Sequence, residues 1–472
     1  MRLSIFGAIA LVAIATQAFA QSRPSATNMR LLGYSDLEGR SADQPVIHEQ
    51  DGRWIAYIGH NGGSEANPKP LNSLTGKHED NGTSIVDVTD PRRPKYLHHI
   101  PGAPGSDEQG GAQTVQVCDG KALPKGDAKK TYLLRSFGTS AHEIWDVSNP
   151  VRPELLARIE GEQSTHRNWW ECNTGIAYLA SGVSGWRAHR VLQVYDLSNP
   201  EHPVHIRDFG LVGQQPGATE PVSTDLQSAI STGPDGNRVY LGYGADKDGI
   251  LQIVDREKLL KGAKEPTAQN LLDPQVGRLD LSALTGAHSV FPVPGIKIAE
   301  FAHDAASTRN FVVVTGQATA AECQEPRQMA WFVDVTSESR PMVVSSYTPF
   351  ERSGDFCSRG GRFGTASSNQ NMTPIYYQRL MFFAAFNAGV RVVDMRDPYQ
   401  PIEMAHYIPA VTPRAQPSCA TLDGKQHCVK VIQTSNVEVD DRGYIYIVDR
   451  ADNGMHILEL TGAARRIANF SK

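Results

Sequence analysis

The chain has 472 residues, enough for two or three average domains or for one large repeat fold, and its apolar content suffices for a buried core. The formal net charge is −5 and no long run of one sign of charge occurs, which excludes a nucleic-acid partner that needs a basic patch. The 42 glycines and 29 prolines are spread along the chain, as many tight turns require.

The first 20 residues have the features of a secretory signal peptide. Arg2 precedes an apolar stretch over residues 5–15, and Ala18-Phe19-Ala20 matches the small-x-small pattern of a cleavage site. We expect removal of residues 1–20 and export to the periplasm or the medium. A membrane anchor is the alternative, but the apolar stretch is too short to span a bilayer comfortably and no second one follows, so we expect no membrane-spanning segment.

One strand motif recurs along the rest of the chain: two apolar residues, Asp, one apolar residue, and a turn that often contains two prolines. The copies are centred on Asp87, Asp146, Asp196, Asp255, Asp334, Asp394 and, with Glu in place of Asp, Glu459. A motif that returns at intervals of roughly sixty residues marks a repeat architecture. We expect each motif Asp to accept hydrogen bonds from the following turn; a ring of metal-binding carboxylates is the alternative.

Each motif strand lies within a larger unit of four short strands. A β-branched and aromatic run precedes it, a further extended segment precedes that run, and a fourth strand follows the turn. Repeated four-stranded antiparallel sheets bury their edges by packing radially, so we expect residues 21–472 to form one all-β domain, a seven-bladed β-propeller. Residues 28–39 resemble a fourth strand and are expected to complete the last blade and close the ring; the alternative is a free N-terminal arm.

The motif strands SIVDV, QIVDR, WFVDV and RVVDM resemble those of the LVIVD-repeat proteins, a family of exported bacterial β-propellers. The resemblance extends over essentially the whole mature chain and implies the same fold. It assigns no catalytic residue, because the family is largely uncharacterised. The fourth copy departs from the pattern by losing its prolines, and the seventh by losing its Asp.

Six cysteines in an exported chain predict three disulfides. One pair flanks an Asp-Gly turn and is expected to close a hairpin; another lies on the innermost strands of adjacent blades; the third lies in loops around the fifth blade. The expected pairs are Cys419–Cys428, Cys118–Cys172 and Cys323–Cys357.

The loops that enter the innermost strands of a propeller, and those between its second and third strands, open on the face where pockets form. We place His48, Gln113, His166, Gln227, His288, Asn369 and Asn436 in the first set, and His60, His78, His142 and His189 in the second. Neutral imidazole binds Zn and Cu, so His48, His166 and His288 are candidate ligands of one transition-metal ion, Cu or Zn. The alternative is that they are ordinary hydrogen-bonding groups at strand ends.

Three further residues are candidates for a ligand pocket. Trp169 follows His166 and is expected to be a pocket wall or part of the core. Arg359 and Arg362 lie in a glycine-rich segment that either receives an anion or forms a solvated turn. The segment 61–82 either covers the mouth of the channel or is a tolerated insertion.

Two classes of function fit these features. The first is a binding or interaction scaffold for a protein, a glycan or a small molecule. The second is a metal-dependent enzyme, an oxidoreductase with His ligands at the channel mouth. The chain contains no Gly-x-Ser-x-Gly elbow, so Ser-His-Asp hydrolysis has no support. The sequence leaves open whether the protein is an enzyme.

Overall fold

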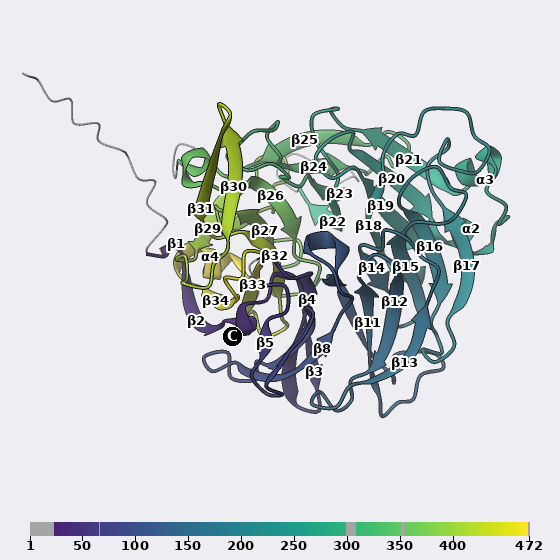
Figure 1. The fold of residues 1–472 in the computed structure, drawn as a ribbon. Helices are drawn as coiled ribbons and strands as arrows, with labels where there is room; N and C mark the ends of the chain where they lie inside the picture. Colours follow the sequence, from purple (N-terminus) through teal and green to yellow (C-terminus); the bar gives the residue numbers. More distant parts are fainter. Residues whose placement is uncertain (1–22, 66, 299–307, 351–354, 471–472) are drawn as a thin grey trace, which may run out of the picture.

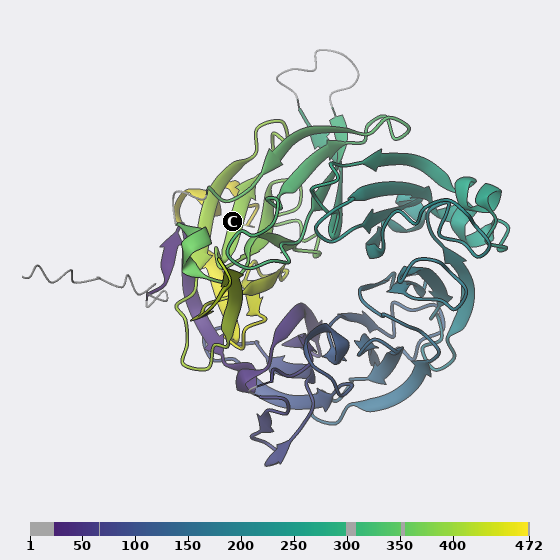
Figure 2. The ribbon, with the colours of Figure 1, turned by 45° about the horizontal axis from the view of Figure 1, so that its top comes forward.

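The computed structural model describes residues 23–65, 67–298, 308–350 and 355–470. The expected signal peptide and its cleavage site lie outside these residues. The described chain forms antiparallel sheets of mostly four strands that are arranged radially about one axis (Figures 1 and 2). This arrangement confirms the predicted all-β class and the predicted four-stranded antiparallel sheets.

The sheets follow one another in chain order. The first contains β3 (Ala42–Gln50), β4 (Arg53–Asn61), β7 (Gly82–Asp87) and β8 (Lys95–Pro101), with β9 (Gly111–Ala112) beside β4. The second contains β10 (Val115–Asp119), β11 (Thr131–Phe137), β12 (Ala141–Asp146) and β13 (Glu154–Ile159). The third contains β14 (Asn168–Trp170), β15 (Ile176–Ser181), β16 (Val191–Asp196) and β17 (Val204–Phe209). The fourth contains β18 (Leu226–Ser231), β19 (Arg238–Tyr243), β20 (Ile250–Asp255) and β21 (Gln275–Asp280).

The fifth sheet contains β22 (Ser289–Lys297), β23 (Thr308–Thr315), β24 (Ala330–Asp334) and β25 (Met342–Tyr347). The remaining strands form a nine-stranded sheet with two parts. One part is β26 (Phe363–Ser368), β27 (Leu380–Phe386), β28 (Val390–Asp394), β29 (Ile402–Ile408) and β1 (Ser25–Thr27). The other part is β32 (Thr434–Val439), β33 (Ile445–Asp449), β34 (Met455–Leu460) and β2 (Met29–Ser35). A single residue pair between β27 and β32 joins the two parts.

Short elements connect or extend these sheets. The hairpins are β5 (Leu71–Asn72) with β6 (Lys77–His78), and β30 (Pro417–Leu422) with β31 (Lys425–Lys430). The helices are α1 (Gly233–Gly236), α2 (Arg256–Lys261), α3 (Ala268–Leu272) and α4 (Gly462–Ile467), with 3-10 turns η1 (Leu37–Gly39), η2 (Asp107–Gln109) and η4 (Phe356–Arg359). In the part of the chain that the structure describes, no helix has both the length and the apolar character needed to cross a bilayer.

The N-terminal strand β2 pairs antiparallel with β34, from Met29 opposite Leu460 to Ser35 opposite Met455. This is the pairing expected between the segment before the first unit and the last motif strand. The first and last parts of the chain therefore share one sheet, as the purple and yellow strands in Figure 2 show. The alternative of a free N-terminal arm is wrong for residues 29–35.

The motif Asp residues have the structural role that was expected. In five copies the carboxylate accepts a hydrogen bond of 2.8–3.1 Å from the backbone N–H two residues further along, which holds the turn into the fourth strand. In the fourth unit, which lacks the prolines, Asp255 instead accepts from the N–H of Lys258 at 3.0 Å and caps α2. The local change in sequence thus produces a short helix in place of a tight turn.

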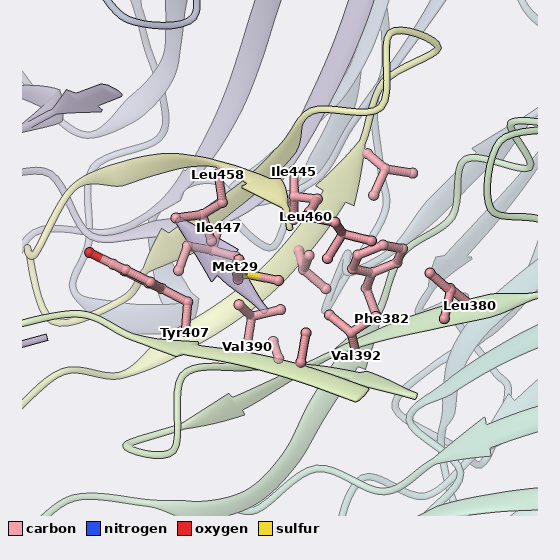
Figure 3. Packing of buried hydrophobic residues seen from close by; sticks show 14 of the residues in the cluster. Met29, Leu380, Phe382, Val390, Val392, Tyr407, Ile445, Ile447, Leu458 and Leu460 are labelled. Atoms are coloured by element: carbon pink, nitrogen blue, oxygen red, sulfur yellow. The ribbon is translucent and has the colours of Figure 1, made fainter. Parts of the chain in front are cut away.

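The apolar core lies between neighbouring sheets, because every strand alternates its side chains between two faces. The largest cluster fills the space between β27–β28 and β33–β34 and includes Phe382, Val392, Ile447 and Leu458 (Figure 3). Met29 of β2 belongs to the same cluster, so the N-terminal strand contributes packing as well as backbone pairing.

The three predicted disulfides are confirmed: Cys118–Cys172, Cys323–Cys357 and Cys419–Cys428. The first joins the second and third sheets. The last lies across the β30–β31 ladder, where its two residues are directly opposite each other. A cross-link constrains the unfolded chain more when the closed loop is longer, so the bridge that spans 54 residues stabilises more than the bridge that spans 9.

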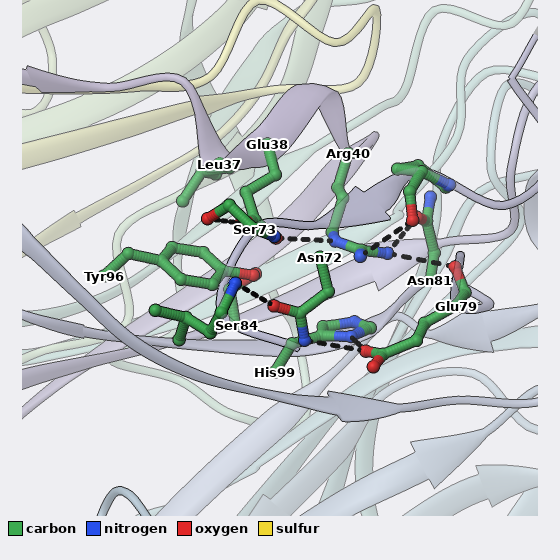
Figure 4. A network of polar contacts seen from close by, with 12 residues as sticks. Leu37, Glu38, Arg40, Asn72, Ser73, Glu79, Asn81, Ser84, Tyr96 and His99 are labelled. Carbon is green, nitrogen blue, oxygen red and sulfur yellow. Dashed lines mark hydrogen bonds and ion pairs between the residues drawn. The ribbon is translucent and has the colours of Figure 1, made fainter. Parts of the chain in front are cut away.

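The segment 61–82 is held against the first sheet by a buried arginine. Arg40 donates to the backbone oxygens of Glu79 (3.2 Å) and Pro70 (3.3 Å) and to Oδ1 of Asn81 (3.1 Å) (Figure 4). The Glu79 carboxylate in turn lies 3.0 Å from Nδ1 of His99. The segment is therefore a packed insertion on the first sheet, and none of its described residues lines the cavity at the channel mouth.

Candidate functional site

The strand register identifies equivalent positions at the entry of the innermost strands. Each innermost strand pairs with the second strand of its sheet, and the second strand pairs with the motif strand, so the sheets can be compared residue by residue. Counted five residues back along each innermost strand from the residue level with the motif Asp or Glu, the equivalent positions hold Asp43, Gln113, His166, Gln227, His288, Ala366 and Ser435; bulges near this end of β3, β18, β26 and β32 shift the direct pairing by about one residue.

The predictions for His48, Asn369 and Asn436 were therefore wrong in register. His48 lies five residues beyond Asp43 on β3, roughly 16 Å away at the rise of an extended strand. Its Nε2 is 2.9 Å from Oδ1 of Asp119, at the other end of the neighbouring innermost strand. The physical reason is that β3 already begins at Ala42, so its entry is earlier than its sequence pattern indicates.

Asn369 follows the end of β26, where its Oδ1 accepts from the N–H of Phe382 at 3.1 Å. Asn436 lies one residue past the entry position and accepts from the hydroxyl of Ser367 at 2.9 Å. Both amides are thus used between strands. The entry positions that we had assigned to these two asparagines are occupied by Ala366 and Ser435.

His166 and His288 are brought together at the channel mouth, with ring centroids 5.7 Å apart. Nδ1 of His288 donates to the backbone oxygen of Ala366 at 2.9 Å, while its buried Nε2 has no hydrogen-bond partner among the described residues. Burial lowers the pKa of both imidazoles well below the usual value, and nearby arginines add to the effect, so both rings are neutral at pH 7.

The predicted three-histidine set does not form, because His48 is far from the other two. Within the described ranges, no three His, Cys, Asp or Glu side chains are grouped closely enough to hold a metal ion. The arrangement around His166 and His288 is instead rich in arginine and amide side chains.

Two adjoining cavities open at this mouth, and we refer to them together as the mouth cavity. The larger has a volume of about 430 Å³ and the smaller about 180 Å³. Both are lined by His166, Arg190 and η2 residues Glu108 and Gln109. The larger is also lined by Ser106, Asp107, Gln227, Ala245, Gln317, Thr319 and Arg362; the smaller by Gln113, Thr139, Ser164, Thr165, His189 and Asp225.

The acidic wall of the mouth cavity comes from η2, which lies in the connection between the first and second sheets. Arg450, just after β33, donates to Asp107 at 2.7 Å and to Glu108 at 3.3 Å. These carboxylates outweigh burial and raise the pKa of Arg450. The contact ties η2 to the end of β33 and neutralises part of the charge of η2.

The other predicted site residues lie away from this cavity. His60 is fully buried in β4, with Nε2 2.7 Å from the hydroxyl of Ser84, and His142 is buried 2.7 Å from a Glu162 carboxylate oxygen. His78 lies in the hairpin of the insertion. Trp169 packs against two hydrophobic clusters, so it belongs with the core. The guanidinium of Arg359 lies over the ring of Phe356.

Sequence reasoning missed Arg167, Arg190 and Arg450. A signal for two of them was present: the loops between second and third strands, in which histidines were predicted, also carry Arg190 and Arg450. The acidic η2 segment gave no such signal, because the path of a long connection does not follow from strand periodicity.

A buried carboxylate lies further down the innermost strand β32. Glu438 accepts hydrogen bonds from the backbone N–H groups of Gln370, Asn371 and Val439, and burial nevertheless raises its pKa to about 7. Because the folded pKa lies above the ordinary value of 4.5, the folded state holds this proton more tightly, and its stabilisation is lost as pH rises from about 4.5 through about 7.

We therefore expect Glu438→Gln to be more stable than the native protein at pH 8, by about 1–3 kcal/mol, and equally stable near pH 4.5. The amide oxygen keeps the contacts that Oε1 makes. Urea unfolding at both pH values measures this difference. Glu403→Gln is the opposite control: burial of Glu403 is outweighed by His406 and Arg391, which lower its pKa to about 2, so its loss is expected to destabilise at pH 8. A Glu438→Gln protein that is less stable at pH 8 than at pH 4.5, relative to native, contradicts the prediction.

Comparison with known proteins bears on the fold. No known family profile matches the chain, and no curated protein matches it. Solved structures match at 10% identity: Sqt1 of Chaetomium thermophilum (92% of this chain, 98% of that chain, TM-score 0.48) and a chain of the mitotic checkpoint complex (98%, 99%, 0.46). A putative 6-phosphogluconolactonase of Bacteroides fragilis matches at the same identity (89%, 94%, 0.50). Of these three structures only the last reaches a TM-score of 0.50, and at 10% identity its similarity indicates a shared fold and nothing about function. With the radial sheets, the chain is a β-propeller of four-stranded antiparallel sheets.

Proposed function

We propose that the protein is an exported, seven-bladed β-propeller that binds a small polar ligand in the mouth cavity. Seven blades are supported by the motif strands, each of which is the third strand of a four-stranded set. They are also supported by the apolar clusters, which fill the spaces between successive sets, including the space between the last set and the first. The LVIVD-like strands support membership of that family.

Export is supported by the disulfides, which persist in oxidising compartments, together with the signal-like residues 1–20. N-terminal sequencing of the protein recovered from the periplasm or medium tests this part. We expect the mature chain to begin at Gln21. A chain that keeps Met1 and remains in the cytoplasm contradicts it.

The observation that carries the binding function is the mouth cavity itself. It has the volume of a small-molecule site, and side chains from several sheets converge on it. Rigid sheets position these side chains, while their functional atoms come from the loops, as in most binding sites on repeat scaffolds.

A thermal-shift screen with small anionic, cationic and neutral compounds tests the proposal. We expect at least one compound to stabilise the native protein and to lose its effect in Ala245→Trp, because Ala245 lines the cavity and an indole fills it. Ala263→Trp is the matched control, since Ala263 is exposed beyond α2 and outside the cavity. If no compound distinguishes the two variants, the small-molecule function is wrong.

The metal-dependent enzyme remains an alternative with narrower support. This alternative is supported by two histidines, His166 and His288, and by the hydrogen bond from the His288 ring to the backbone oxygen of Ala366, which orients that ring. Elemental analysis of the purified native protein and of the His166→Ala/His288→Ala variant tests it. One Cu or Zn per native chain, lost in the variant, supports that alternative.

A further inference from the structure

We infer that the ligand of the mouth cavity is a small oxyanion, held between the guanidinium groups of Arg190 and Arg362. This inference rests on the binding function proposed above and names the chemical class of the ligand. It follows from the unequal pairing of charges around the cavity.

Arg362 is the first observation. Its side chain lines the larger cavity, yet no Asp or Glu of the described residues lies within ion-pair distance of its guanidinium. Its near neighbour is the ring of Phe386, at 5.6 Å. Burial lowers the pKa of Arg362 to about 10, and Arg450 adds to this effect. A half-buried cation without an ion-pair partner costs folding free energy, which an anionic ligand would offset.

Arg190 is the second observation. It lines both cavities, and its Nη2 donates to the neutral side chain of Gln227 at 3.1 Å. Its buried Nε has no hydrogen-bond partner among the described residues. Asp225, the carboxylate that acts most on it, accepts instead from the backbone N–H and the ring of His189, at 2.8 and 3.2 Å, and from the backbone N–H of Arg190 at 3.4 Å. The guanidinium thus has N–H groups at the cavity wall that no described residue accepts from.

Arg167 adds positive charge behind the same wall. It is 6% exposed, its Nε has no partner among the described residues, and burial lowers its pKa. Asp43 is the main carboxylate that acts on it, and no ion pair joins them within 4 Å. Asp107 and Glu108 act on these arginines only at longer range: neither forms an ion pair with Arg167, Arg190 or Arg362 in the described chain, because both are bound by Arg450.

The polar lining suits oxygen atoms carrying negative charge. Guanidinium forks bind carboxylate and phosphoryl oxygens through paired N–H groups. Gln227, Gln317 and Thr319 on the same wall offer further hydrogen-bonding groups. The volume of about 430 Å³ accommodates an organic acid of a few carbon atoms or a phosphate ester.

Isothermal titration calorimetry with citrate and with inorganic phosphate tests the inference. We expect one or both to bind the native protein, and binding to weaken with added salt. Arg190→Gln and Arg362→Gln are each expected to weaken that binding by at least about tenfold, the usual effect of removing a hydrogen-bonded charge. Arg396→Gln is the matched control, because Arg396 is exposed and pairs with the motif residue Asp394. Binding of citrate but not phosphate would identify a carboxylate ligand, and binding of phosphate but not citrate would identify a phosphoryl ligand.

Folding of the variants is checked by their ligand-free melting temperatures. Removing a half-buried cation that has no ion-pair partner is expected to leave the melting temperature of Arg362→Gln unchanged or higher, which a purely structural arginine would not do. If citrate and phosphate fail to bind, or bind all variants equally, the oxyanion inference is overturned. The proposed binding function is still supported if a neutral or cationic compound in the screen stabilises the native protein and not Ala245→Trp. If no compound does so, both the oxyanion inference and the binding function are wrong.

Discussion

Arg135→Met is expected to lower the free energy of unfolding by about 3–5 kcal/mol, because it removes the buried cation of a buried carboxylate and leaves that carboxylate only a half-exposed arginine. The side chains of Arg135 and Glu143 are each 1% exposed, and Nε and Nη2 of the arginine donate to Glu143 Oε2 at 2.9 and 2.7 Å. The same guanidinium crosses to the first sheet, where it donates to the backbone oxygens of Ile100 (3.0 Å) and Pro101 (2.8 Å). It therefore joins two neighbouring sheets.

The matched control is Arg158→Met, which removes a second cation from the same carboxylate. Arg158 is 35% exposed, so water replaces much of its interaction, and we expect a loss of about 1 kcal/mol or less. Urea unfolding followed by tryptophan fluorescence measures both. Equal losses would mean that the buried bonds between the sheets contribute nothing beyond surface pairing.

The repeat made most of this fold predictable. A short apolar strand that ends in Asp and a proline turn specifies its own register, since the Asp must lie where it can accept from the turn that follows. Asp87, Asp146 and Asp196 all do so. Cysteine pairing followed from the same register, because Cys118 and the segment of Cys172 occupy neighbouring innermost strands.

The site was less predictable because it depends on where innermost strands begin. Side chains alternate faces along a strand, so a displacement of a few residues moves a residue to another face or to the other end of the channel. His48 was misplaced in this way, while His166 was not. The pairing of Arg450 with Asp107 joins residues 343 positions apart, and no local pattern encodes such a contact.

Deletion of residues 23–35 is expected to prevent recovery of a folded monomer, because it removes the strand that pairs with β34. The deletion exposes the backbone of Met455–Leu460 as an open sheet edge, which favours aggregation. It also takes Met29 out of the core cluster that contains Leu458 and Leu460. At about 1 kcal/mol per ladder hydrogen bond, loss of this seven-residue strand costs more than about 5 kcal/mol even if some folded protein remains.

The control deletion of residues 23–27 removes β1, which is exposed and pairs only at the outer edge of β29. We expect that variant to remain monomeric, with a melting temperature close to native. Size-exclusion chromatography and thermal unfolding of the two deletions compare them directly. In a ring of radial sheets, each blade packs on two neighbours, so an incomplete last blade weakens its contacts with the first blade as well as its own ladder. Similar behaviour of the two deletions would show that β2 is dispensable and that the ring does not depend on its closing strand.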